Sequence, residues 1–134
     1  MKLTAQAIER INTNALVAEL MARGWNAYLP VYDEGIDLLA TQDDCARLLK
    51  IQLKSRWTID KKYHGRDIHI AFREGDVWYL VPHDEAVSMG NELGYCARAS
   101  WTKGGQWSVG SMSAALLKMM APYALDSQLG PSRL

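Results

Sequence analysis

The chain has 134 residues, enough for one domain with a buried core, and its 15 basic and 15 acidic residues cancel to a formal net charge of zero. Its two cysteines form no CxxC pair and its histidines have no zinc-like spacing, which excludes a disulfide framework and a structural zinc. The sequence shows no signal-peptide pattern and no apolar run of bilayer-spanning length, so we expect a soluble protein in the reducing cytoplasm.

A helix and three strands are predicted in the first part of the chain. Residues 4–23 have the apolar spacing of an amphipathic helix, with Thr4 as its N-cap and Gly24 as its stop. Strands are then expected over residues 25–32, 35–41 and 46–55, and a short polar turn joins the last two as a hairpin. In the third strand the period of two puts Lys50, Gln52 and Lys54 on one face and apolar residues on the other.

The second part of the chain is expected to mix loops, a hairpin and helices. Residues 56–66 have no clean period, so we interpret them as a mobile loop over the polar face of the third strand. A hairpin over residues 67–72 and 76–81 leads to a helix capped by Asp84, a strand over residues 95–100 and a glycine-rich loop. An apolar helix should end near residue 121, and the predicted domain covers residues 1–125, with residues 126–134 as a frayed tail.

The charges are unevenly distributed although they cancel overall. Residues 47–73 contain two acids, Asp60 and Asp67, and eight basic residues, which makes this stretch about +6 and the remainder about −6. The eight are Arg47, Lys50, Lys54, Arg56, Lys61, Lys62, Arg66 and Arg73. Such asymmetry suits a polyanion bound on one side of the molecule. The alternative interpretation is an ordinary solvated surface.

Two short motifs carry the chemistry. Gly35-Ile36-Asp37 opens one predicted strand, and Gln52-Leu53-Lys54 ends the next, so a carboxylate, an amide and an ammonium project from neighbouring strands. An acid and a second oxygen ligand can hold Mg²⁺, and a lysine can orient a nucleophile or stabilise charge at phosphorus. The simpler alternative is that Asp37 is a strand-edge acid paired with Lys54.

With these residues the chain resembles the PD-(D/E)XK nuclease superfamily over about its first 85 residues, and within it archaeal Holliday-junction resolvases and small homing endonucleases that use Gln-x-Lys. The pattern would be Glu19 on the first helix, Asp37 in Gly-Ile-Asp, and Gln52-Leu53-Lys54. Gln52 stands where most members have Asp or Glu, which removes one anionic ligand. The resemblance implies an α/β fold with a restriction-endonuclease-like αβββ core, in which a mixed, mainly antiparallel sheet is flanked by helices.

The resemblance also implies an activity, namely Mg²⁺-dependent DNA endonuclease, with Mn²⁺ as a substitute metal. Asp37, Gln52, the Leu53 carbonyl and Glu19 would serve the metal, and Lys54 would orient the attacking water. The expected substrate is double-stranded or branched DNA, and cutting both strands calls for a homodimer or higher homo-oligomer. The residues expected to contact nucleic acid are Arg56, Lys61, Lys62, His64 and Arg66.

Two other classes of function remain open from the sequence. One is a nuclease-fold module without catalysis that binds DNA or protein, a reading that Gln52 keeps open. The other is an immunity-type partner protein in which the basic stretch meets an acidic protein. Glu19 could equally be an ordinary solvated helix residue. Trp101 and Trp107 could stack on bases, although packing is the commoner role for such residues.

Overall fold

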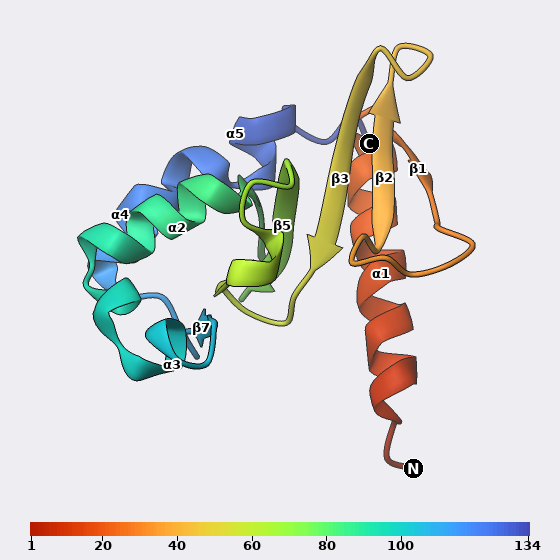
Figure 1. The fold of residues 1–134 in the computed structure, drawn as a ribbon. Helices are drawn as coiled ribbons and strands as arrows, with labels where there is room; N and C mark the ends of the chain where they lie inside the picture. Colours follow the sequence, from red (N-terminus) through yellow and green to blue (C-terminus); the bar gives the residue numbers. More distant parts are fainter.

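The computed structural model describes residues 1–134 and contains a five-stranded sheet, a two-stranded sheet and five α-helices (Figure 1). The helices are α1 (Ala5–Ala22), α2 (His83–Glu92), α3 (Ala99–Thr102), α4 (Ala114–Met120) and α5 (Leu125–Leu129). The strands are β1 (Asn26–Tyr28), β2 (Leu38–Gln42), β3 (Arg47–Leu53), β4 (Thr58–Asp60), β5 (Ile68–Glu74), β6 (Val77–Pro82) and β7 (Gln106–Ser108). Three 3₁₀ turns complete it: η1 (Lys61–Tyr63), η2 (Tyr95–Ala97) and η3 (Ala121–Tyr123).

Helix α1 begins and ends where its sequence predicts. The Thr4 hydroxyl accepts the Ala7 N–H at 3.1 Å, and Gly24 follows the helix at φ +82°, a conformation that glycine adopts without strain. Leu16 and Leu20, four residues apart, are both fully buried. This apolar stripe attaches α1 to the sheet.

The large sheet has the strand order β1-β2-β3-β5-β6. Only β3 and β5 run parallel, while β1–β2, β2–β3 and β5–β6 are antiparallel. The parallel pair needs a crossover, and the chain makes it through β4 and η1, with β4 pairing with β7 in the small sheet. The mixed, mainly antiparallel sheet and both predicted hairpins are therefore confirmed.

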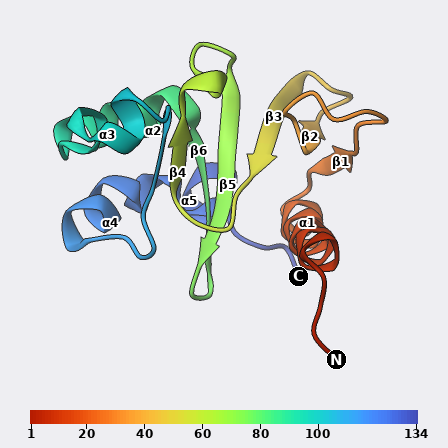
Figure 2. The same cartoon turned by 60° about the horizontal axis from the view of Figure 1, so that its bottom comes forward.

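Two hydrophobic clusters cover the two faces of the sheet. Leu16 and Leu20 of α1 pack with Leu38, Ile51 and other residues on one face. The other cluster contains residues from β4, β5, β6, α2 and α4. Figure 2 shows α1 on one side of the sheet and α2, α3 and α4 on the other. None of the helices combines the length and the hydropathy that crossing a bilayer would require.

The prediction of a mobile loop over residues 56–66 is wrong. Trp57, Ile59 and Tyr63 are at most 2 % exposed and belong to the hydrophobic core, and β4 and η1 occupy most of the segment. The apolar residues of this segment alternate over only a few positions and stand among many charged residues, so the sequence alone suggests a loop. The segment is instead a fixed part of the fold whose charged side chains point outward.

Three later expectations also need correction. Asp84 lies in the first turn of α2, whose N-cap is Pro82, and residues 95–100 form η2 and the start of α3 rather than a strand. The tail predicted over residues 126–134 is helical to Leu129, which packs against the core, whereas residues 131–134 are exposed and outside any helix or strand. The Arg23 side chain ties this tail to α1 by donating to the Gly130 carbonyl at 2.9 Å and by pairing with Asp126.

Candidate metal centre and nucleic-acid interface

Asp37 lies immediately before β2 and faces the end of β3. Its backbone N–H donates to the Ile51 carbonyl at 2.9 Å, and its carboxylate accepts the Leu53 N–H at 2.7 Å. The β2–β3 ladder ends at the pair Leu38–Ile51, and the two hydrogen bonds of Asp37, to Ile51 and to Leu53, place it beside the part of β3 that contains Gln52. The fold thus brings the Asp37 motif and the Gln52-Leu53-Lys54 motif together at one end of the β2–β3 hairpin.

Gln52 has a buried acceptor without a donor. Its side-chain oxygen Oε1 is inaccessible to solvent and has no hydrogen-bond partner. A buried acceptor left unpaired costs roughly 1–3 kcal/mol. A hard cation favours oxygen ligands such as carboxylates, amide oxygens and backbone carbonyls. The donor set of Asp37 and Gln52 therefore fits Mg²⁺, and a bound cation would satisfy the unpaired oxygen.

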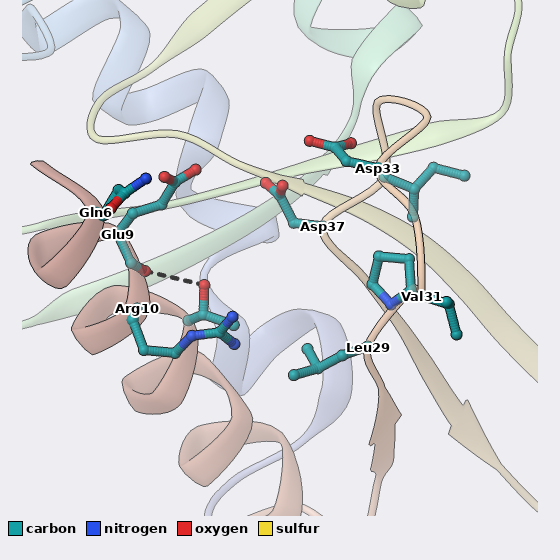
Figure 3. Close-up of a pocket in the computed structure, with 10 residues that line it drawn as sticks. Gln6, Glu9, Arg10, Leu29, Val31, Asp33 and Asp37 are labelled. Atoms are coloured by element: carbon teal, nitrogen blue, oxygen red, sulfur yellow. Dashed lines mark hydrogen bonds between the residues drawn. The ribbon is translucent and has the colours of Figure 1, made fainter.

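A cleft of about 480 Å³ opens beside Asp37, between the first turns of α1 and residues 29–37. Figure 3 shows the carboxylates of Glu9, Asp33 and Asp37 turned toward a common space. None of the three forms an ion pair with a lysine or an arginine, and Asp37 is not paired with Lys54. Gln52 does not line this cleft; its position is set by the sheet register. The cleft thus holds three carboxylates and one basic residue, Arg10, which forms no ion pair with any of them.

The electrostatics of Asp37 follow from this arrangement. Burial raises the pKa of the Asp37 carboxyl above its ordinary value, and the charges of Asp33 and Glu9 raise it further. The hydrogen bond from the Leu53 N–H and the charge of Lys54 act in the opposite direction without cancelling the rise in pKa. A half-buried carboxylate among other carboxylates is stabilised in its ionised form when a cation binds.

The structure does not bring Glu19 to this site. Glu19 pairs with Arg23 at 2.7 Å, beside Asp126 in the C-terminal segment. It is ten residues from Glu9, which is about 15 Å along a helix. The chain direction explains why Glu9 occupies the site: β1 runs back from the end of α1, so β2 starts level with the N-terminal half of the helix. The antiparallel pairing of β1 with β2 is the signal that favours Glu9 over Glu19.

Lys54 directly follows β3 and lies close to the acidic cleft. Its N–H donates to the Ala71 carbonyl at 2.8 Å, which continues the parallel pairing with β5. Its ammonium lies 5.3 Å from the centre of the buried Tyr63 ring, and its charge lowers the pKa of Asp37. A cation held over an aromatic ring is restrained without a carboxylate neutralising it. Lys54 therefore keeps its charge available beside Asp37.

The five residues expected to contact nucleic acid are all exposed: Arg56, Lys61, Lys62, His64 and Arg66. Lys61 lies 5.5 Å from the Trp101 ring centre, and Lys62 lies 5.1 Å from that of Tyr63. The Arg66 guanidinium donates to the Glu34 carbonyl at 3.1 Å, so Arg66 also touches the segment that leads to Asp37. Lys62 thus shares the Tyr63 ring with Lys54 and Arg66 touches the turn before Asp37, and these side chains are less free than a mobile loop would leave them.

Two other groups have structural roles: the cluster of His64, His83 and Asp84, and the pair of tryptophans Trp101 and Trp107. The ring nitrogens of His64 and His83 lie near the Asp84 carboxylate, but the His83 Nε2 accepts the Asp60 N–H at 3.0 Å. The neutral His83 ring therefore carries its proton on Nδ1, where it faces Asp84, and offers no lone pair to a metal. Trp101 belongs to the core and Trp107 stacks on Tyr95, which confirms packing for both tryptophans.

Two solved structures are similar to the chain. The bacterial homing endonuclease I-Ssp6803I is 18% identical over 96% of this chain and 95% of that protein, with a TM-score of 0.57. Hjc, a Holliday junction resolvase from Archaeoglobus fulgidus, is 16% identical over 57% of this chain and 73% of that one, with a TM-score of 0.45, too low to support a conclusion. No protein-family profile and no curated protein sequence matches the chain. The similarity to the homing endonuclease confirms the nuclease-type fold.

Proposed function

We propose that this protein is a Mg²⁺-dependent DNA endonuclease of the PD-(D/E)XK type, in the Gln-x-Lys variant. The observation that carries the proposal is the buried, unpaired Gln52 oxygen, one residue before Leu53, whose N–H donates to the Asp37 carboxylate. A buried amide oxygen without a donor and a half-buried carboxylate among other carboxylates are each unfavourable unless a cation binds. The fold shared with a homing endonuclease adds support, because a nuclease site occurs on that architecture.

The metal would be held by Asp37, Gln52 and the backbone carbonyl of Leu53, with Glu9 in the role that the motif alone suggested for Glu19. When bound, Mg²⁺ neutralises charge on the phosphate and lowers the pKa of a coordinated water. Asp37 is oriented for this role by the Leu53 N–H, which fixes one of its carboxylate oxygens at 2.7 Å. Asp33 adds negative charge to the same cleft. Mn²⁺ is expected to substitute, since it shares the preference for oxygen ligands.

Lys54 would act on the nucleophile and on the phosphate. Its ammonium is restrained over the Tyr63 ring on the same strand end as Gln52, so it can orient a water for attack and stabilise the charge that develops at phosphorus. Positioning and charge neutralisation would together supply most of the rate.

The substrate we propose is double-stranded or branched DNA. Residues 47–73 carry a charge of about +6, and the five side chains named above are all exposed in this stretch. One copy of the chain would supply one set of metal ligands, from Asp37 and Gln52. Cutting both strands would therefore require two copies related by a two-fold axis, so we propose a homodimer.

A nuclease-fold module that only binds DNA or protein is the second candidate. The observation in its favour is that Gln52 contributes no negative charge to the metal. Glu9 and Asp33 weigh against it, because they bring two further carboxylates to the Asp37 cleft without any paired cation. Retaining three unpaired acids has no evident benefit for a protein that binds only phosphates.

The test is a cleavage assay on linear, nicked, flapped and four-way DNA with Mg²⁺, with Mn²⁺ and with a chelator. The proposal predicts cleavage of at least one DNA form with either metal and none with the chelator. Asp37→Ala should abolish cleavage, whereas Glu92→Ala, an exposed acid of α2 far from the cleft, should leave it intact. DNA binding without cleavage in both metals would support the binding module instead.

A further inference from the structure

Residues 63–66 contact both motifs of the proposed metal site, and we call them the brace. The Tyr63 ring lies under the Lys54 ammonium at 5.3 Å. It also reaches the other motif: a β-carbon on Gly35 would be 3.7 Å from the Tyr63 ring and 3.1 Å from the Arg66 guanidinium. Gly35 therefore packs directly against the brace.

Arg66 makes the polar contact between the brace and the turn that carries the acids. Its Nη2 donates to the Glu34 carbonyl at 3.1 Å, and its own carbonyl accepts the Lys50 ammonium at 2.7 Å. Gly35 has φ +89°, so the chain here leaves the strand geometry before it reaches Asp37. Within the turn, the Asp33 side chain accepts the Gly35 N–H at 2.8 Å. Arg66 is the side chain from outside the turn that hydrogen-bonds to it.

The brace is itself fixed from the opposite side. The Gly65 N–H donates to both oxygens of the Asp84 carboxylate, at 3.1 and 3.2 Å, and the Arg66 N–H donates to the Tyr63 carbonyl at 3.2 Å. Tyr63 is 2 % exposed and anchors the segment in the core. The guanidinium of Arg66 therefore extends from a rigid base, which is what a side chain needs in order to hold another segment in place.

We infer that Arg66 is a positioning residue for Asp37, through the Glu34 carbonyl and the Gly35 backbone, rather than only a phosphate contact. The inference rests on the proposed function, because its purpose is to hold Asp37 and Asp33 in the geometry that binds Mg²⁺. The sign of the change in Mg²⁺ affinity distinguishes this positioning role from a simple electrostatic effect of the Arg66 charge. Removing a cation beside an acidic site should tighten Mg²⁺ binding by Coulomb's law. Removing a positioning contact should weaken Mg²⁺ binding, typically by about 10-fold or more.

The experiment compares the unaltered chain, Arg66→Ala and the charge-matched control Lys62→Ala, without DNA. Lys62 is an exposed cation of the same region whose contacts are Asp60 and the Tyr63 ring, not the turn at residues 33–37. Calorimetry gives the Mg²⁺ affinity, and metal-free amide hydrogen exchange reports on residues 29–37. We expect Arg66→Ala to bind Mg²⁺ about 10-fold more weakly and to exchange faster in this segment. Lys62→Ala should bind as tightly as the unaltered chain or tighter, with unchanged exchange.

The outcomes separate the inference from the function on which it rests. Mg²⁺ affinity that is unchanged or higher in Arg66→Ala, with unchanged exchange over residues 29–37, would overturn the positioning role. A loss of Mg²⁺ affinity in Lys62→Ala equal to that in Arg66→Ala would also overturn it, because the effect would not depend on contact with the turn. No Mg²⁺ binding by the unaltered chain would contradict the proposed function, and the metal-free exchange would still decide whether Arg66 holds the turn.

Discussion

Asp37→Asn should remove the effect of Mg²⁺ on stability while keeping the fold. Asparagine has the same shape as aspartate, and its Oδ1 can still accept the Leu53 N–H that the carboxylate accepts at 2.7 Å. A ligand at 100 times its dissociation constant stabilises the folded state by about 2.7 kcal/mol. For a chain of this length that is a rise in melting temperature of roughly 10 °C. We expect this rise in the unaltered chain and almost none in Asp37→Asn.

Without metal the same substitution should be stabilising at neutral pH. The pKa of Asp37 is raised in the folded chain by burial and by the charges of Asp33 and Glu9, so its ionisation costs free energy in the fold. That cost is absent below the unfolded-state pKa and fully present above the folded-state pKa. The metal-free melting temperature of Asp37→Asn should therefore exceed that of the unaltered chain at pH 7, and the difference should disappear as the pH falls below 4.

Thermal melting across pH, with and without Mg²⁺, provides both readings from one set of samples. Glu92→Ala serves as the matched control, because it also removes one negative charge but lies on the exposed face of α2. A full Mg²⁺-induced rise in Asp37→Asn would refute the assignment of Asp37 as a metal ligand. A lower metal-free melting temperature at pH 7 would refute the electrostatic reasoning alone.

Three further predictions concern other residues of the site. Glu9→Gln should lower the cleavage rate by about 10–100-fold. Glu19→Gln should change only thermal stability, since Glu19 pairs with Arg23. Equal losses of cleavage rate in the two variants would contradict the assignment of Glu9, rather than Glu19, to the site. Gln52→Glu should tighten Mg²⁺ binding in calorimetry and lower the metal-free stability, because it adds a second carboxylate near Asp37. Weaker Mg²⁺ binding would count against Gln52 as a metal ligand. Replacing Lys61 and Lys62 together by alanine should reduce the salt slope of DNA affinity by about 2, and an unchanged slope would show that both are solvated surface.

The strand pairs that build the site were predictable from the sequence. Alternation in residues 46–55 put Gln52 and Lys54 on one face, and Ile51 on the opposite face is fully buried against the α1 side of the sheet. A short polar turn then left little choice of register, so the end of β3 that carries Gln52 had to lie beside Asp37. These are local patterns, in which each residue is placed by neighbours within about 15 positions.

The choice between Glu9 and Glu19 depends on contacts between parts of the chain that are distant in the sequence. Both acids lie on the same predicted helix, and the sequence does not show which end of the helix lies level with Asp37. That depends on how β1 folds back along β2. Glu19 instead meets Arg23, whose other partner, Asp126, comes from the far end of the chain. Pairing over more than 100 residues leaves no periodic trace in the sequence.

The prediction of a loop over residues 56–66 was wrong for a similar reason. Only Trp57 and Ile59 show strand alternation, and the strand that pairs with β4 is β7, in which Ser108 lies opposite Thr58. A three-residue strand with so distant a partner cannot be separated from a loop by periodicity. Its cations suggested a mobile loop that contacts nucleic acid, but Tyr63 and Arg66 connect the segment to the turn before Asp37.

The central claim is that Asp37 and Gln52 together bind one divalent cation. Anomalous diffraction from crystals of the unaltered chain grown with Mn²⁺ tests it most directly, because it locates the metal without relying on activity. The account predicts a peak within bonding distance, about 2 Å, of the Asp37 carboxylate, the Gln52 Oε1 and the Leu53 carbonyl. A Mn²⁺ peak elsewhere on the molecule, with the Gln52 oxygen still unpaired, would contradict it.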